Sequence, residues 1–197
     1  PLLRAKNISI AFGALQALEM VSFEIYPGEV MAIIGPNGAG KTTMLNIING
    51  FYRPDGGSIE FEGKERPRNM RPNVVAAQGI ARTFQNLALF KGMTTLQNIM
   101  LGRTMNMHSH FFSQLLYWGF SQKEEIQHRE AVERIIDFLE IENIRKTHTS
   151  MLPYGLQKRV ELARALAAEP KLLLLDEPMA GMNLEEKEDL ARFILDS

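Results

Sequence analysis

A short glycine-rich stretch constrains the fold of this chain more than any other part of its sequence. Residues 35–42 read Gly-Pro-Asn-Gly-Ala-Gly-Lys-Thr and fit the pattern G-x-x-x-x-G-K-[ST]. An apolar run at 30–34 precedes the stretch, and a helix-like segment at 43–48 follows it. Strand, glycine loop and helix in this order are typical of a P-loop, so we expect residues 30–34 to form a strand.

The residue types of this stretch suit the binding of phosphate. Gly35, Gly38 and Gly40 allow backbone conformations and close approaches that a Cβ would block. Successive backbone N–H groups can then surround an anion, and the helix that follows adds its positive end. In a P-loop, Lys41 reaches the β- and γ-phosphates, and the Thr42 hydroxyl binds Mg²⁺.

We therefore predict that the stretch binds a nucleoside triphosphate. The alternative is a glycine-rich turn with a solvated lysine. Thr43 is placed to bond near the α-phosphate, although a small polar residue is common at any helix start. The predicted nucleotide-binding residues of the stretch are Gly35, Pro36, Asn37, Gly38, Ala39, Gly40, Lys41, Thr42 and Thr43.

Composition excludes several classes of protein. The chain has 197 residues, of which 45% are hydrophobic, enough for one sizeable core with a subdomain. Its formal net charge of −1 provides no basic field, so we expect no nucleic-acid partner. Because there are no cysteines, disulfides and cysteine-based zinc sites are excluded. The apolar runs are too short to span a membrane, so any work at a membrane is expected from its aqueous side.

Periodicity and turn residues predict an α/β core that is interrupted by a helical insert. We expect Gly50 to end the first helix, and residues 121–124 to form a capping box that opens a later helix. Methionines at 105–107 and aromatic residues at 110–118 pack the insert's own core or form an exposed docking surface. The predicted elements are strands at 2–12, 20–25, 58–61 and 172–175, a surface loop at 67–73, and helices near 96–100, 121–139, 156–168 and 184–195.

A second candidate site follows the four leucines at 172–175, which read as a buried parallel strand. Asp176 and Glu177 come directly after this run, and alternation along a strand points them in different directions. Asp176 can then hold Mg²⁺, while Glu177 serves as general base or orients the attacking water. Acidic residues at a strand end also often cap the next helix, which is the alternative.

A third candidate is the segment 152–166, in which Leu156, Val160, Ala163 and Ala167 share one helical face. Gly155 lies at the N-terminus of the predicted helix, where backbone N–H groups can receive an anion. The alternative is an ordinary amphipathic helix that is entered through a glycine.

Taken together, these segments resemble the ATP-binding cassette (ABC) ATPases in residue type and in order. The resemblance covers the whole chain. The residue sequences at 79–85 and 152–157 are similar to those of the ATPase subunits of branched-chain amino-acid importers. The matching segments are Phe12 as the adenine-stacking aromatic, 35–43 as Walker A, Gln85 as the Q-loop glutamine, 152–157 as the signature, 172–177 as Walker B and 180–183 as the D-loop.

Three departures from the family pattern are visible. Pro153 stands where the signature serine hydrogen-bonds a γ-phosphate, so Gly155 and neighbouring amides are expected to carry more of that contact. Asn183 stands at the D-loop aspartate position and keeps hydrogen-bonding capacity without charge. The switch histidine of the family lies beyond Walker B, whereas all four histidines here precede it, so we expect a C-terminally incomplete cassette.

The resemblance implies a fold, with a P-loop NTPase core, N-terminal antiparallel β elements and a helical subdomain. Residues 1–94 and 156–197 would form the nucleotide-binding core, and 95–155 the helical subdomain that ends in the signature. It also implies ATP and Mg²⁺ as cofactors. Catalytic roles fall to Glu177, Gln85 and Lys41, and metal binding to Thr42, Gln85 and Asp176.

The resemblance further implies an ATPase that powers a transporter from the cytoplasmic face of the membrane. Its partners would be a second cassette packed head to tail, with Gly155 covering the ATP of the other copy, and integral membrane permease subunits. One alternative is a non-transport ABC ATPase acting on DNA or ribosomes, although long coiled coils, tandem cassettes and a basic stripe are absent from the sequence. Another is a nucleotide-binding fragment with little hydrolysis.

Overall fold

Two compact units divide the chain, Pro1–Ile80 and Ala81–Ser197. The computed structural model describes residues 1–83, 89–103 and 120–197, with only the backbone described at 120–127. These units do not follow the boundaries at 94 and 155 suggested by the sequence, and the division into core and helical subdomain stays a prediction.

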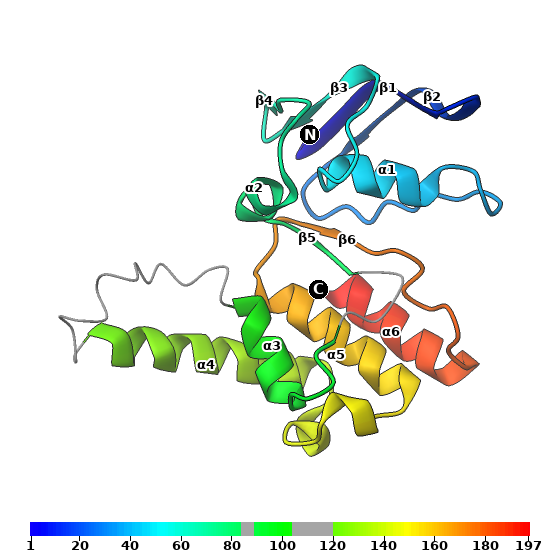
Figure 1. The fold of residues 1–197 in the computed structure, drawn as a ribbon. Coiled ribbons are helices and arrows are strands. Elements are labelled where there is room, and N and C mark those ends of the chain that lie inside the picture. Colours follow the sequence, from blue (N-terminus) through cyan, green and yellow to red (C-terminus); the bar gives the residue numbers. More distant parts are fainter. Residues whose placement is uncertain (84–88, 104–119) are drawn as a thin grey trace. The chain divides into compact units, whose positions relative to one another are not determined.

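The first unit is built on an antiparallel sheet whose strand order is β2-β1-β3-β4 (Figure 1). Its strands are β1 (Leu3–Phe12), β2 (Leu15–Ile25), β3 (Gly56–Phe61) and β4 (Lys64–Glu65). The buried positions of β1 run Leu3, Ala5, Ile8 and Ile10, so the alternation slips by one residue in its middle. Asn7 has a φ of 49° at this slip, where the register with β2 shifts, which identifies a β-bulge.

Two helices complete this unit. Helix α1 (Lys41–Ile48) follows the glycine-rich stretch, and Gly50 has a φ of 79° just beyond its C-cap, as predicted. Helix α2 (Pro72–Ala77) begins inside the segment that we expected to be a loop over 67–73. The reason is Pro72, whose fixed φ and missing N–H suit the first turn of a helix.

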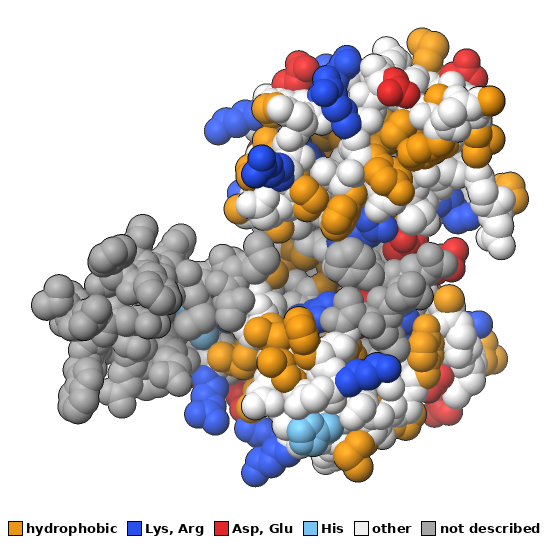
Figure 2. All heavy atoms as spheres, in the orientation of Figure 1, with side chains coloured by type: hydrophobic (Ala, Val, Ile, Leu, Met, Phe, Trp, Pro, Cys, Tyr) orange, Lys and Arg blue, Asp and Glu red, His pale blue; other side chains and the backbone are white. Residues whose placement is uncertain are grey.

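The predicted strand at residues 30–34 is wrong. This run has no regular secondary structure, and Ile34 is 92% exposed. A strand exists through hydrogen bonds to a neighbour, and no described strand pairs with this run. Hydrophobic side chains therefore remain on the surface of the first unit, where several gather on the face seen in Figure 2.

Helices dominate the second unit (Figure 1). Strands β5 (Ile80–Arg82) and β6 (Leu172–Leu174) pair, and Thr83 N donates to Leu174 O at 3.0 Å just beyond them. The capping box predicted at 121–124 is wrong, because the helix already begins at Phe120 and Ser121 lies inside it. The helices are α3 (Thr95–Arg103), α4 (Phe120–Phe138), α5 (Tyr154–Ala167) and α6 (Leu184–Asp196), with 3₁₀ turns at Glu142–Ile144 and Thr149–Met151.

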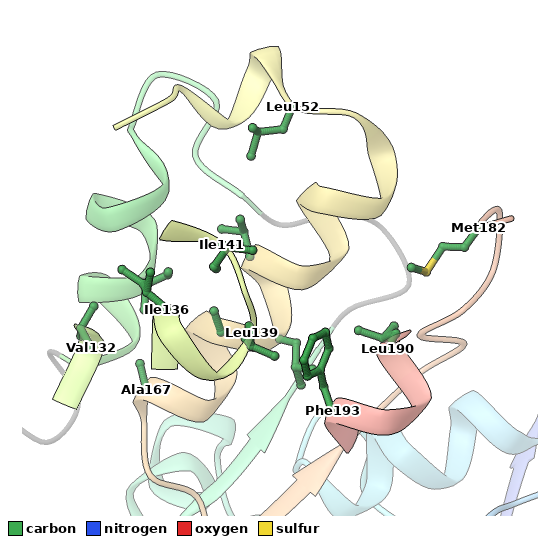
Figure 3. Packing of buried hydrophobic residues seen from close by; sticks show 13 residues of the cluster. Val132, Ile136, Leu139, Ile141, Leu152, Ala167, Met182, Leu190 and Phe193 are labelled. Atoms are coloured by element: carbon green, nitrogen blue, oxygen red, sulfur yellow. The ribbon is translucent and has the colours of Figure 1, made fainter. Parts of the chain in front are cut away.

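The apolar face predicted for α5 packs into the core of the second unit. Val160, Ala163 and Ala167 are completely buried, and Leu156 packs against the same cluster. Figure 3 shows Leu139, which follows α4, and Phe193 of α6 side by side in this cluster. Packing of its apolar face against α3 and α4 therefore stabilises α5, since isolated helices of this length are marginal in water.

Helices in the described part of the chain are all too short or too polar to cross a membrane.

Replacing Leu139 by alanine tests this core. The side chain is completely buried, so its removal leaves a cavity and should lower the free energy of unfolding by about 2–5 kcal/mol. Leu195→Ala is the matched control, because Leu195 is 68% exposed in the same unit and should change stability by less than about 0.5 kcal/mol. Urea denaturation followed by circular dichroism measures both, and equal losses would contradict the assigned core.

Candidate functional site

The glycine-rich stretch forms a tight loop that leads directly into α1. Gly38 and Gly40 have φ values of 84° and 83°, in the left-handed region that glycine occupies at little cost. Ala39 N donates to Pro36 O at 3.2 Å and closes the turn. Gly40 is the N-cap of α1, and its carbonyl accepts the bond from Met44 N at 2.9 Å. The N-terminal amides of α1 therefore continue directly from the loop.

Lys41 places its ammonium on the backbone of this loop. Its Nζ donates to Gly35 O at 2.8 Å and to Pro36 O at 2.9 Å. A cation and a helix N-terminus are thus combined within one short segment of the first unit. This arrangement is electrostatically suited to a phosphate group.

Gly40 also lies close against the sheet. A Cβ on Gly40 would lie 2.6 Å from Ala17 O and 2.7 Å from a methyl carbon of Leu18, both in β2. A Cβ on Gly38, by contrast, would meet nothing within 4 Å. Of these two glycines, only Gly40 is therefore required both for its backbone conformation and for its space.

The opposite end of α1 is held by a buried arginine that the sequence did not suggest. Arg66 donates from Nη1 to Ile48 O at 2.8 Å, and its backbone N donates to Ile59 O in β3 at 2.8 Å. Burial lowers the pKa of Arg66 from its ordinary value, because the charged form loses hydration. A cation at the C-terminus of a helix is favourable for the helix dipole, so Arg66 braces α1 against the sheet.

Phe12, the expected adenine-stacking residue, ends β1 on the surface of the first unit. It is 45% exposed and meets Tyr52 edge to face, with ring centroids 5.3 Å apart and planes at 67°. Tyr52 is itself exposed and lies shortly after α1. Because offset and edge-to-face contacts are the favourable aromatic geometries, Tyr52 restricts the position of the Phe12 ring.

Asp176 and Glu177 differ in exposure, and both lie beyond the end of β6 at Leu174. Asp176 is buried, whereas Glu177 is exposed at the start of a turn in which Ala180 N donates to Glu177 O at 3.1 Å. Glu177 has a φ of 46°, a left-handed conformation that costs about 1–2 kcal/mol for a residue with a Cβ. Strained backbone of this kind is frequent at functional positions.

Arg82 forms a buried ion pair with Asp176 that sequence reasoning missed. Its Nη2 lies 2.9 Å from Asp176 Oδ2, and the two side chains are 5% and 4% exposed. The pair joins the ends of β5 and β6. Its only signal in the sequence is an arginine at the end of a short strand, three residues before Gln85.

Gly155 lies in the first turn of α5, which begins directly after its N-cap, Pro153. Gly155 is buried, and a Cβ there would lie 2.1 Å from Glu186 Oε1. Asn183 and Glu186 form a capping box at the start of α6, with bonds of 2.9 and 3.0 Å. In the second unit, Asn183 therefore has a structural role as a helix cap, which its hydrogen-bonding amide permits and which the sequence reading missed.

The donor set predicted for magnesium is chemically suitable. A hydroxyl from Thr42 and a carboxylate from Asp176 are hard oxygen donors, and Mg²⁺ commonly binds one or two carboxylates together with nucleotide phosphates. Among the described residues, no group of three or more His, Cys, Asp and Glu side chains forms a metal site alone. Gln85, the remaining predicted ligand, lies outside the described residues, as do the methionines at 105–107 and the aromatic residues at 110–118.

Alanine substitutions at two glycines test the loop. Gly40→Ala should lower both the free energy of unfolding and the affinity for ATP, because its Cβ collides with the backbone of β2. Gly38→Ala is the matched control, since it has nearly the same φ but open space, and should cost only about 1–2 kcal/mol of backbone strain. Thermal unfolding and ATP titration measure both; equal effects would refute the proposed close approach.

Comparison with known proteins identifies the family. The ABC transporter family profile matches residues 18–180. The chain is 36% identical to the high-affinity branched-chain amino acid transport ATP-binding protein BraF of Pseudomonas aeruginosa, over 98% of this chain and 76% of that protein.

Solved structures agree with this match. An ATP-binding cassette of an ABC transporter in its ADP conformation is 36% identical, with a TM-score of 0.83, over 99% of this chain and 76% of that one. A dimeric ATP-binding cassette in a post-hydrolysis state, bound to ADP and Pi, is 25% identical, with a TM-score of 0.77, over 98% and 81%. The α/β cassette fold with its antiparallel β elements is therefore confirmed, and the chain belongs to the ABC transporter family as an ATPase subunit.

Proposed function

We propose that this chain binds Mg-ATP on its glycine loop and hydrolyses it to power the import of branched-chain amino acids. The observation that carries the proposal is the position of Lys41. Its ammonium lies on the backbone of a loop with two left-handed glycines, at the N-terminus of α1. The substrate follows from the likeness to BraF, whose name states branched-chain amino acid transport.

The residues of the first unit bind the nucleotide. Loop amides and the positive end of α1 hold the phosphates, Lys41 neutralises the β- and γ-phosphates, and Phe12 stacks on the adenine. From the rest of the chain, Asp176 and Gln85 would join Thr42 as the residues that hold Mg²⁺. When bound, Mg²⁺ neutralises charge that develops on the phosphate oxygens.

Glu177 is the proposed general base. Its carboxylate is exposed and follows Asp176 directly. An accessible carboxylate can accept the proton of a water molecule that attacks the γ-phosphate. Gln85 is proposed to help position that water.

A second cassette and a membrane permease are the proposed partners. Gly155, at the N-terminus of α5, would cover the ATP on the glycine loop of the other copy, and the dimeric cassette among the similar structures supports such an assembly. The chain would work on the cytoplasmic face of the membrane, held there peripherally by integral membrane permease subunits. We propose no nucleic-acid partner.

Replacing Glu177 by glutamine tests this function in the purified ATPase subunit. The change keeps the size of the side chain but removes the base, so hydrolysis should fall by about 10²–10⁴-fold while ATP still binds. Mg-ATP should then accumulate a dimer. Phosphate release and light scattering measure the two effects.

Lys41→Ala is the companion variant, because it removes the main cation at the phosphates. It should lose binding of a fluorescent ATP analogue, and therefore form no ATP-dependent dimer. Normal turnover by Glu177→Gln would contradict the assignment of the base. Normal binding by Lys41→Ala would contradict the assignment of the loop.

A further inference from the structure

The ion pair between Arg82 and Asp176 has no part in the reaction as described above. It lies at the end of β6, where the proposed metal carboxylate is placed, and both side chains are at least 95% buried. Two desolvated charges in contact are costly to separate. The pair therefore restrains the Asp176 side chain strongly.

Strand pairing fixes the geometry of this ion pair. Thr83 N donates to Leu174 O at 3.0 Å, so a backbone hydrogen bond joins the residue after Arg82 to a residue shortly before Asp176. Leu172 and Leu174 are buried in β6, which leaves that strand little freedom to rotate. The guanidinium thus reaches the carboxylate from a neighbouring, hydrogen-bonded strand.

Arg82 Nη2 donates to Asp176 Oδ2 at 2.9 Å. This charge-assisted hydrogen bond restrains the position of the Asp176 carboxylate. Partners that orient a metal ligand in this way strengthen metal binding, and their loss typically costs 10–100-fold in metal affinity.

We propose that Arg82 is a positioning residue that presents the Asp176 carboxylate to the Mg²⁺ of the bound nucleotide. The inference rests on the proposed role of Asp176 as a metal ligand. In this account Arg82 touches neither nucleotide nor metal and acts through Asp176.

The test measures how strongly Mg²⁺ supports binding of a non-hydrolysable fluorescent ATP analogue to the full chain. Arg82→Met and Arg82→Gln should raise the Mg²⁺ concentration for half-maximal enhancement by about tenfold or more. Affinity for the analogue in EDTA should not change, because the glycine loop is intact. Arg82→Lys, which keeps the charge, should restore most of the wild-type midpoint.

Arg103→Met is the matched control for loss of a buried arginine. Arg103 is buried in the same unit and pairs with Glu169 at 2.6 Å, so its replacement should lower stability without moving the Mg²⁺ midpoint. Arg82→Gln retains hydrogen-bonding capacity and carries the test if Arg82→Met does not fold. Circular dichroism establishes that each variant is folded.

Two outcomes would overturn the proposal. An unchanged midpoint in folded Arg82→Gln would mean that Arg82 is only structural. A lower midpoint would mean that Mg²⁺ must displace Arg82 from the carboxylate. Asp176→Asn separates this question from the proposed function: if that variant keeps the full Mg²⁺ enhancement, the assignment of Asp176 as metal ligand fails, whatever Arg82 does.

Discussion

The glycine loop, residues 35–42, depends on the close approach of Gly40 to β2. The left-handed φ of Gly40 turns the chain into α1, and its missing Cβ lets the backbone pass against Ala17 and Leu18. Lys41 follows as the first residue of α1, so the same turn determines where the ammonium lies. Arg66 holds the other end of the helix at Ile48. The loop therefore has a rigid base on both sides, which pre-organises it for an anion.

In the second unit the carboxylates are positioned by burial of the strand that precedes them. Leu172 and Leu174 face the interior, Asp176 continues that side, and the backbone then turns outward at Glu177. Two adjacent acidic residues consequently meet different surroundings. One is held in a buried ion pair, and the other is accessible to water. This difference permits one to bind a metal and the other to act as a base.

Local patterns predicted the elements whose signals lie within one segment. The helix after the glycine loop, the apolar face of α5 and the strand before Asp176 all follow from periodicity or from a motif, and all are present. The strand at 30–34 was wrong, because an apolar run indicates burial but does not provide the neighbour that a strand requires. The helix at Pro72 was missed, because proline was taken only as a loop residue although it also suits a first helical turn.

In the candidate site too, residues were predicted where their signal is local and missed where their partners are distant in the sequence. Lys41 and the glycines were predicted together because the motif is contiguous. Arg66 and Arg82 were not predicted, since their partners, Ile48 and Asp176, are 18 and 94 residues away in the chain. The capping box was expected at Ser121 but occurs at Asn183. Because Asn183 was interpreted as a D-loop residue, its hydrogen bonding with Glu186 at the start of α6 was not predicted. Long-range polar contacts leave little trace in a single sequence.

The central claim is that the glycine loop of one copy and the N-terminus of α5 of another enclose the same ATP. The sequence has no cysteine, so single cysteines can be introduced at the exposed residues Asn37 and Tyr154 on separate chains. The two variants are mixed and treated with a short bifunctional maleimide. The account predicts a cross-linked heterodimer that forms with a non-hydrolysable ATP analogue and not without nucleotide. Absence of the cross-link with the analogue, or equal cross-linking without nucleotide, would contradict it.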